Sequence, residues 1–312
     1  MGEQTLSLRV GNKKEFMKKA IVTGASGLLG RAILRVFSAS PEWEVTGLAK
    51  NRAGGGLKYL DLLQAEAIRE LVAKECPDLV IHAAAERRPD RCEGQPEITH
   101  ALNVTATSTL CEAAQAVGAW TLFISTDYVF DGRTPPYHPG DLPHPLNAYG
   151  ESKLAGERAT LAADSGNGIL RVPILYGEVE ELGESAVTVI ARPLLDPTPA
   201  KMDHWAVRRP TLVDDVASAC LGLANLRSTG QSGGGVWHFG GDEAMTKYDM
   251  AMAMAEVLER DASHLLPDDQ PPVGAPRPRD CSFDCGAFDA IAPLDRARFR
   301  DKIGGILSPH LS

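Results

Sequence analysis

Residues 20–30 read AIVTGASGLLG, and this stretch decides the fold. The apolar run at 20–23 predicts a buried strand, and a glycine-rich turn follows it directly. Beyond the turn, apolar residues recur at helical spacing, and they are Leu28, Leu29, Ile33 and Phe37. A strand, a glycine turn and a helix in this order form the first unit of a parallel α/β sheet.

The glycines of this turn predict a bound dinucleotide. Gly24, Gly27 and Gly30 form GxxGxxG, a variant of the dinucleotide fingerprint. The first glycine permits the tight turn, the second lets the backbone approach a pyrophosphate, and the third lets the helix lie close to the sheet. Free N–H groups at the start of the helix would then face the phosphates. The alternative is a turn that merely needs glycines, but the flanking strand and helix favour cofactor binding.

The alternation of strands and helices continues along the chain. Apolar runs predict further strands at 43–50, 78–85, 119–126 and 168–177. Helical periodicity predicts helices at 64–76, 96–117, 148–163 and from 213 onward. Strands that alternate with helices imply a doubly wound parallel sheet of the Rossmann type, with right-handed crossovers.

The pattern also predicts two structural units. After a flexible arm at 1–17, we expect a nucleotide-binding domain at 18–177, to which residues 212–238 return. The C-terminal third carries more insertions and turn-forming residues. Residues 178–211 and 239–312 are therefore expected to form a smaller α/β lobe that binds a substrate or a partner.

The end of the second predicted strand favours NADP(H) over NAD(H). An NAD site usually has an acidic residue at this point to hold the 2′-hydroxyl of the ribose. Here the strand ends in Lys50, Asn51 and Arg52, and an arginine can bind a 2′-phosphate with two charge-assisted hydrogen bonds. The alternative is that these are ordinary surface residues. Further along, Asp61 and Leu62 are candidates to flank the adenine.

Composition excludes several classes of protein. The net charge of -9 and the absence of a basic stripe argue against binding to nucleic acid. No apolar run approaches the ~18 residues of a membrane span, and the first residues do not resemble a signal peptide. We therefore expect a cytoplasmic protein. No pair among the six cysteines is spaced as CxxC, so free thiols and no metal site are predicted, although Cys281 and Cys285 could pair or bind a metal.

Residues 147–153 read NAYGESK and contain a candidate acid/base pair. Tyr149 and Lys153 are four residues apart, so they share one face of a helix. A neighbouring ammonium favours the phenolate form of a tyrosine, and Lys153 would also bind the nicotinamide ribose. Thr126 or Ser125, at the end of the preceding strand, could hold a carbonyl oxygen. In a reductase Tyr149 would donate a proton while hydride arrives from the cofactor.

Several segments carry a family resemblance. GASGLLGR, HAAA, ISTDYVFDG, YGESK and LRVPILYG resemble the extended short-chain dehydrogenase/reductase superfamily, especially its dTDP-4-dehydrorhamnose reductase branch. Within that branch the chain most resembles the family of methionine adenosyltransferase regulatory beta subunits. The segments that carry this likeness lie at 82–90, 125–132, 145–157, 170–180, 184–189, 202–205 and 245–251.

The resemblance implies a cofactor, a partner and a set of site residues. The partner would be the catalytic subunit of methionine adenosyltransferase, whose activity this chain would modulate in a hetero-oligomer. NADP(H) would be bound by Gly24, Ser26, Gly27, Leu28, Leu29, Gly30, Lys50, Asn51, Arg52, Asp61, Leu62, Ala83, Arg87, Tyr149, Lys153 and Leu175. Thr126, Tyr149 and Lys153 would be the catalytic residues of a reductase, here with vestigial chemistry.

Two departures from the reductases argue against reduction of a dTDP-sugar. Residues 86–90 read ERRPD where the reductases carry an aromatic residue followed by Thr-Ala-Val-Asp. Arg87 could reach the cofactor there, or could be a surface residue. The loop at 203–211, DHWAVRRPT, is longer than its counterpart and lacks its glycine. Trp205 could fill the space of a sugar, or could pack between lobes. An active NADPH-dependent reductase of a nucleotide-linked 4-keto-sugar stays the alternative function, because the catalytic residues are intact.

Overall fold

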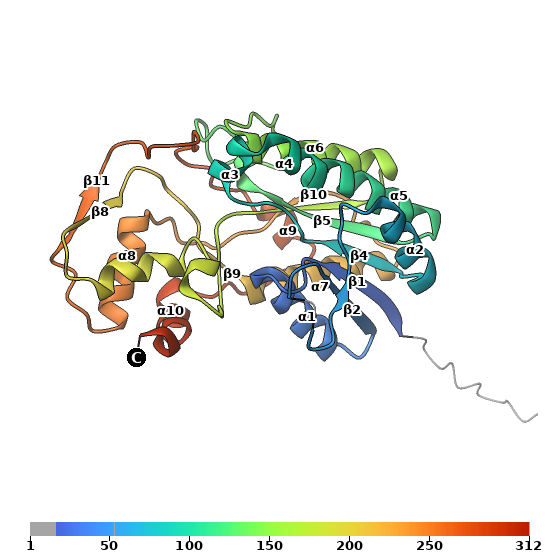
Figure 1. Ribbon diagram of the computed structural model, residues 1–312, viewed down its shortest axis with the longest axis horizontal. Coiled ribbons are helices and arrows are strands. Elements are labelled where there is room, and N and C mark those ends of the chain that lie inside the picture. The colour runs from blue at the N-terminus through green and yellow to red at the C-terminus, as the bar shows by residue number, and fades with distance from the viewer. Residues whose placement is uncertain (1–16, 53, 312) are drawn as a thin grey trace, which may run out of the picture.

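The computed structural model describes residues 17–52 and 54–311 and is built around one parallel sheet (Figure 1). Its strand order is β10-β6-β5-β4-β1-β2-β3. The strands are β1 (Lys18–Thr23), β2 (Trp43–Ala49), β3 (Lys58–Tyr59), β4 (Leu79–His82), β5 (Trp120–Thr126), β6 (Gly168–Val172) and β10 (Gly235–His238). The order reverses between β1 and β4, so the predicted doubly wound sheet is confirmed. The arm predicted at 1–17 lies outside the described residues except for Met17.

Helices cover both faces of the sheet. They are α1 (Leu28–Ala39), α2 (Ala65–Glu75), α3 (Pro89–Gly94), α4 (Pro96–His100), α5 (Ala106–Ala116), α6 (Ala148–Ala163) and α7 (Val213–Ser228). Figure 1 shows α1 and α7 together on one face, and α2, α5 and α6 on the other. The helix predicted at 96–117 contains a π-helical turn, η1 (Ala101–Thr105), between α4 and α5.

Residues 168–177 do not form the single strand that their apolar run predicts. The run divides into β6 and β7 (Leu175–Tyr176), which leaves the main sheet and pairs with β9 (Thr211–Leu212). Pro173 lies at the division. A proline has no N–H group for a strand ladder, so the main sheet cannot continue through this position.

A second hydrophobic core lies beside the sheet, on the left of Figure 1. It contains Tyr176, Ile190, Met250, Phe299 and Ile303. The elements beyond the main sheet are η2 (Asp127–Val129), η3 (Leu182–Glu184), η4 (Thr188–Leu195), β8 (Ala200–Asp203), α8 (Lys247–Val257), β11 (Leu265–Asp268), α9 (Gly286–Asp289), α10 (Phe299–Leu307) and η5 (Ser308–His310). β8 and β11 form a parallel pair of their own. The limits of the two predicted units stay a prediction.

The glycine turn brings α1 against the end of β1. Gly24 has a φ of +68°, a left-handed conformation that glycine adopts without strain. A Cβ atom at Gly30 would lie 2.2 Å from the carbonyl oxygen of Gly24 and 2.7 Å from the Cα of Ala25. A side chain at position 30 would therefore push α1 away from the turn.

This contact predicts that alanine at position 30 lowers the stability of the protein, although glycine-to-alanine replacement in a helix usually raises it. Glycine-to-alanine replacement in a helix usually stabilises a protein by roughly 0.5–1 kcal/mol. We expect that gain for Gly305→Ala, because position 305 of α10 has no neighbouring atom within 4 Å of the new Cβ. Gly30→Ala should instead lower the stability by about 1–3 kcal/mol, as overpacking does. Thermal unfolding of both variants checks this, and equal stabilisation by the two would contradict the close approach at Gly30.

Candidate functional site

The first helix begins without a partner for its free N–H groups. α1 starts at Leu28, the N-cap Gly27 offers no side-chain hydrogen bond, and the first turn contains no acidic residue. A helix start carries orphan donors and a partial positive charge. The turn also lies beside the point where the strand order reverses. This geometry can hold a pyrophosphate, as the glycine pattern predicts.

The structure brings two of the predicted adenosine-site residues into contact. The Lys50 ammonium lies 2.8 Å from a carboxylate oxygen of Asp61. Asn51 is exposed next to Lys50. Leu62 belongs to the hydrophobic core that contains Leu48, so its side chain is committed to packing. Only the backbone of Leu62 is then available to an adenine.

Arg52 is drawn back onto the glycine turn. Its guanidinium donates to the carbonyl oxygen of Ser26 at 2.6 Å, to Glu180 at 2.5 Å and to Glu184 at 3.2 Å. Its φ of +96° is uncommon for a residue other than glycine. The predicted 2′-phosphate ligand is therefore already paired with two carboxylates.

Sequence reasoning missed Arg31 and Glu184. The Arg31 guanidinium makes a double contact with the Glu184 carboxylate, at 2.7 and 2.8 Å. Burial alone would raise the pKa of Glu184, but the Arg31 hydrogen bond and charge and the N–H of Glu180 lower it to about 2. Arg87 donates to the backbone oxygen of Glu184. Arg31 directly follows the third glycine, which was a usable signal, whereas nothing in the sequence links the turn to a glutamate 153 positions away.

The remaining predicted contacts lie around the same turn. Ala83, just beyond β4, and Leu28 and Leu175 are partly buried against the core beneath the sheet. A Cβ at Gly24 would meet Ala84 at 2.9 Å, so the turn and the segment after β4 are adjacent. These positions stay predictions as cofactor contacts.

Thr126 and Tyr149 come together at the end of β5. Tyr149 lies in the first turn of α6, which Asn147 caps by accepting from the N–H of Gly150. The Tyr149 ring packs edge-on against Tyr128, with centroids 5.9 Å apart. Burial raises the pKa of Tyr149, and a hydrogen bond with Thr126 opposes this in part. Tyr149 is therefore a neutral phenol, able to donate a hydrogen bond.

The Lys153 side chain lies over an aromatic ring, a contact that the spacing of Tyr149 and Lys153 does not predict. Its ammonium lies 3.9 Å from the centroid of the Phe123 ring, and the residue is 3% exposed. Burial lowers the pKa of Lys153 to about 7, against an opposing effect of Glu157. Asp127, Cys92 and Tyr128 raise the pKa of Tyr149 further.

A buried ion pair decides between Ser125 and Thr126. The Ser125 hydroxyl donates to the Glu157 carboxylate at 2.5 Å, and Arg171 binds the same carboxylate at 2.8 and 2.7 Å. Ser125 is therefore committed to a structural network. Thr126, which donates to Asp127 at 3.0 Å, is the hydroxyl that borders Tyr149.

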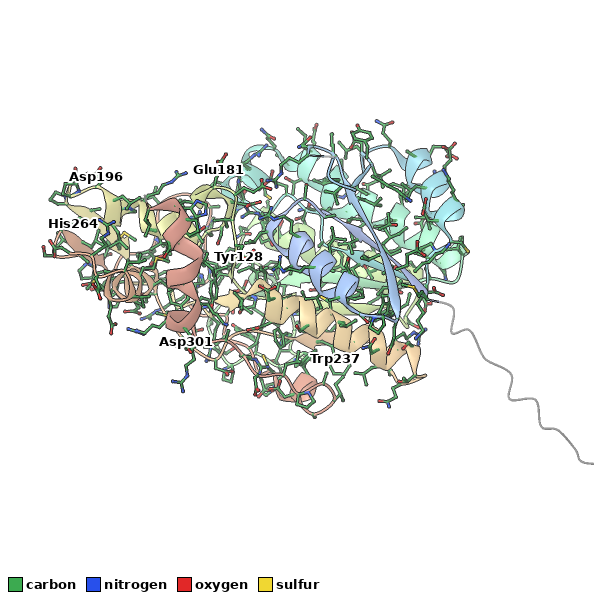
Figure 2. All side chains as sticks on the ribbon, turned by 90° about the horizontal axis from the view of Figure 1, so that it is seen from below. Tyr128, Glu181, Asp196, Trp237, His264 and Asp301 are labelled. Atoms are coloured by element: carbon green, nitrogen blue, oxygen red, sulfur yellow. The ribbon has the colours of Figure 1, made fainter. Side chains whose placement is uncertain are left out.

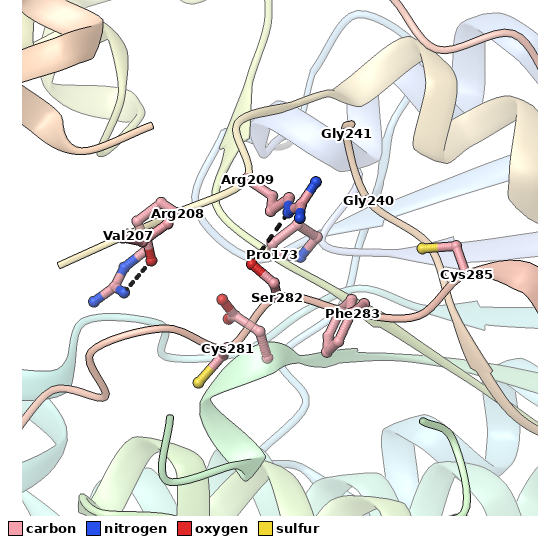
Figure 3. Close-up of a pocket in the computed structure, with 11 residues that line it drawn as sticks. Pro173, Val207, Arg208, Arg209, Gly240, Gly241, Cys281, Ser282, Phe283 and Cys285 are labelled. Atoms are coloured by element: carbon pink, nitrogen blue, oxygen red, sulfur yellow. Dashed lines mark hydrogen bonds between the residues drawn. The ribbon is translucent and has the colours of Figure 1, made fainter. Parts of the chain in front are cut away.

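The cavity beside the end of β5 is small. Figure 3 shows it between the arm at 207–209, Gly240–Gly241 and the segment 281–285. Arg209 crosses it to donate to the Ser282 hydroxyl at 3.1 Å, and Arg208 donates to backbone oxygens, including that of Val207. Its volume of about 10 Å³ is near the limit for one water molecule. Thr126, Tyr149 and Lys153 are not among the residues that line this cavity.

Neither Trp205 nor the cysteines acquire a special role here. Trp205 is partly buried, and its backbone N–H donates to the Asp203 side chain, which turns the loop at this point. Cys281 and Cys285 are free thiols, the first of them buried. Within the described residues, no helix combines the length and apolar character needed to cross a membrane.

Comparisons with known proteins agree over most of the chain. Residues 17–311 match the family described as RmlD substrate binding domain. Methionine adenosyltransferase 2 subunit beta of Xenopus tropicalis is 46% identical over 94% of this chain and 88% of that protein. The protein of the same name from Danio rerio is 40% identical over 94% of this chain and 91% of its own length. The dTDP-4-dehydrorhamnose reductase of Mycolicibacterium smegmatis is 31% identical, over 84% and 76%.

A solved structure supports the same fold. The hypothetical dTDP-4-dehydrorhamnose reductase of Sulfolobus tokodaii superposes with a TM-score of 0.79 at 28% identity. The superposition covers 89% of this chain and 96% of that one.

The burial of Lys153 predicts a pH-dependent effect of its removal. Between the folded-state pKa of about 7 and the ordinary value of 10.5, the unfolded chain binds more protons at this lysine, so the stability rises with pH. The cost of burying the ammonium is therefore larger at about pH 6 than at about pH 9. We expect Lys153→Met to raise the thermal midpoint more at the lower pH. The exposed-residue control Lys74→Met should show no such difference, and an equal shift at both pH values for Lys153→Met would contradict the burial.

Proposed function

The chain belongs to the family of methionine adenosyltransferase beta subunits within the RmlD-like branch, and we propose that it is a non-catalytic, NADP(H)-binding regulatory subunit. It would bind the catalytic subunit of methionine adenosyltransferase and modulate S-adenosylmethionine synthesis. Family membership also confirms the resemblance seen in the sequence. The observation that carries the proposal is this relationship, which extends over nearly the whole chain.

The glycine turn supports the cofactor part of the proposal. The N–H groups at Leu28 and Leu29 would face the pyrophosphate, because α1 starts there without a side-chain cap. A basic residue, Arg52, follows β2, the strand that would meet the adenosine ribose, and it suits a 2′-phosphate. The Tyr149 hydroxyl and the Lys153 ammonium would hold the nicotinamide ribose. In a reductase NADPH would supply a hydride, whereas in the proposed regulator these residues would only bind and orient the cofactor.

The identities to known proteins favour a regulator over a reductase. The relatives named methionine adenosyltransferase 2 subunit beta are 46% and 40% identical to this chain, whereas the relative named dTDP-4-dehydrorhamnose reductase is 31% identical. In a regulator, Tyr149 would anchor the nicotinamide ribose.

A reductase of a nucleotide-linked 4-keto-sugar is the second candidate. Thr126 and Tyr149 lie together, as carbonyl reduction requires, and one relative is named dTDP-4-dehydrorhamnose reductase. Oxidation of NADPH in the presence of such a sugar, lost in Tyr149→Phe, would establish this candidate. No oxidation above the Tyr149→Phe background would remove it.

Isothermal titration calorimetry tests the predicted cofactor. We expect the chain to bind NADP⁺ at least about tenfold more tightly than NAD⁺, because Arg52 can bind the additional phosphate. Arg52→Gln should remove most of this preference while NAD⁺ binding persists. Arg35→Gln is the matched control, since Arg35 lies on α1 and pairs with Asp214. No heat with either nucleotide would contradict the cofactor assignment.

The proposed partnership is tested with the purified catalytic subunit of methionine adenosyltransferase. We expect the two chains to elute together from a sizing column, and the rate of S-adenosylmethionine formation to change when this chain is added. Heat-denatured chain serves as the control. Separate elution together with unchanged kinetics would overturn the regulatory role.

A further inference from the structure

An acidic segment lies against the glycine turn. Residues 178–184, EVEELGE, follow β7 and end in the short helix η3. Figure 2 labels one of them, Glu181, on the border between the sheet and the smaller part of the molecule. We call these residues the acidic segment. Its contacts are made by three arginines: Arg31 in α1, Arg52 after β2 and Arg87 after β4.

Two carboxylates of the segment bind the arginines nearest the turn. Glu184 is 12% exposed and accepts two hydrogen bonds from Arg31 and one from Arg52. Glu180 is 57% exposed and accepts from Arg52. Both arginines also donate to the carbonyl oxygen of Ser26, inside the turn itself. The same two arginine side chains therefore connect the carboxylates to the turn that forms the proposed phosphate site.

Backbone contacts complete the attachment. Arg31 donates to the Glu178 oxygen at 3.1 Å, and Arg87 donates to the Glu184 oxygen. The N–H of Glu180 donates to the Glu184 carboxylate at 3.0 Å, which curls the segment around that side chain. The segment is thus held to the turn mainly by cationic side chains. Such contacts weaken when another anion binds the same cations.

A dinucleotide would bring phosphates into this cluster. Phosphate groups and carboxylates that share one cation site repel each other, and a phosphate is the stronger arginine ligand. Arg52 also has a left-handed backbone, with φ of +96°, which costs energy for a side chain of this kind.

We propose that the acidic segment is a carboxylate latch, in which Glu184 and Glu180 occupy the arginines that the phosphates of NADP(H) bind, so that nucleotide binding releases the segment. The proposal rests on the NADP(H) site proposed above. It adds a regulated element, because occupancy of the site changes the surface formed by residues 178–184.

The structure limits how far the release extends. The Ser185 hydroxyl donates to the Leu175 oxygen at 2.7 Å and accepts from the N–H of Val187 at 3.0 Å. Ser185 is 2% exposed, and Ile190, five residues further on, belongs to the second hydrophobic core. The movement is therefore confined to residues before Ser185, and the core behind it stays in place.

Calorimetry with NADP⁺ on the full chain tests whether the carboxylates of the latch compete with the phosphates of the nucleotide. If the carboxylates compete with phosphate, Glu184→Gln should tighten NADP⁺ binding by about three- to tenfold, the range expected for partly exposed ion pairs. Glu180→Gln should tighten it less, because that residue is more exposed. Glu181→Gln is the matched control, since Glu181 is exposed within the same segment and has no role in the pairing.

The outcomes are distinct. Unchanged or weaker binding by both Glu184→Gln and Glu180→Gln, with wild type binding normally, overturns the latch and leaves the cofactor proposal intact. No binding by wild type or any variant overturns both. Binding of NADP⁺ by the Glu184→Gln and Glu180→Gln variants, with none by the wild type, supports the latch.

Hydrogen exchange gives a second readout that does not depend on the variants. Saturation of wild type with NADP⁺ should increase exchange in residues 178–184 and leave residues 187–195 unchanged. Increased protection of 178–184 would overturn the latch, because it would show that the segment closes over the nucleotide.

Discussion

The structure depends on the close approach of α1 to the end of β1. No side chain fits at position 30, because the Gly24 carbonyl oxygen would lie 2.2 Å from its Cβ. This contact fixes the position of the start of α1 at the carboxyl end of β1. It also places Arg31 and the Ser26 carbonyl at the mouth of the turn, where they meet the acidic segment. Packing at one glycine thus sets both the candidate cofactor site and the ion pairs around it.

Electrostatics then distinguish the two ends of the proposed site. The adenosine end is rich in exposed charge, and each basic side chain there has a carboxylate within 4 Å: Lys50 with Asp61, and Arg52 with Glu180 and Glu184. The nicotinamide end is buried, so Tyr149 stays neutral and the pKa of Lys153 falls toward 7. A neutral Tyr149 can donate a hydrogen bond to a ribose or a proton to a carbonyl, so this end of the proposed site is compatible with both candidate functions.

Much of the fold was predictable because its signals are local. The strand, turn and helix around Gly24 to Gly30, and the spacing of Tyr149 and Lys153, are each contained within a few residues of sequence. The exit of β7 from the sheet was missed, although Pro173 marks it, because an apolar run alone does not show a change of sheet. The direction of the Lys153 side chain was not predictable, since helical spacing fixes a face and not a rotamer. The Arg31–Glu184 pair joins positions far apart in the chain, and no periodicity could reveal it.

The most direct measurement is a crystal structure of the chain grown with saturating NADP⁺. We expect the pyrophosphate within hydrogen-bond distance of the N–H groups of Leu28 and Leu29, with the 2′-phosphate on Arg52 and the Glu184 carboxylate displaced from that guanidinium. A turn without nucleotide under those conditions, or a pyrophosphate bound elsewhere on the chain, would contradict it.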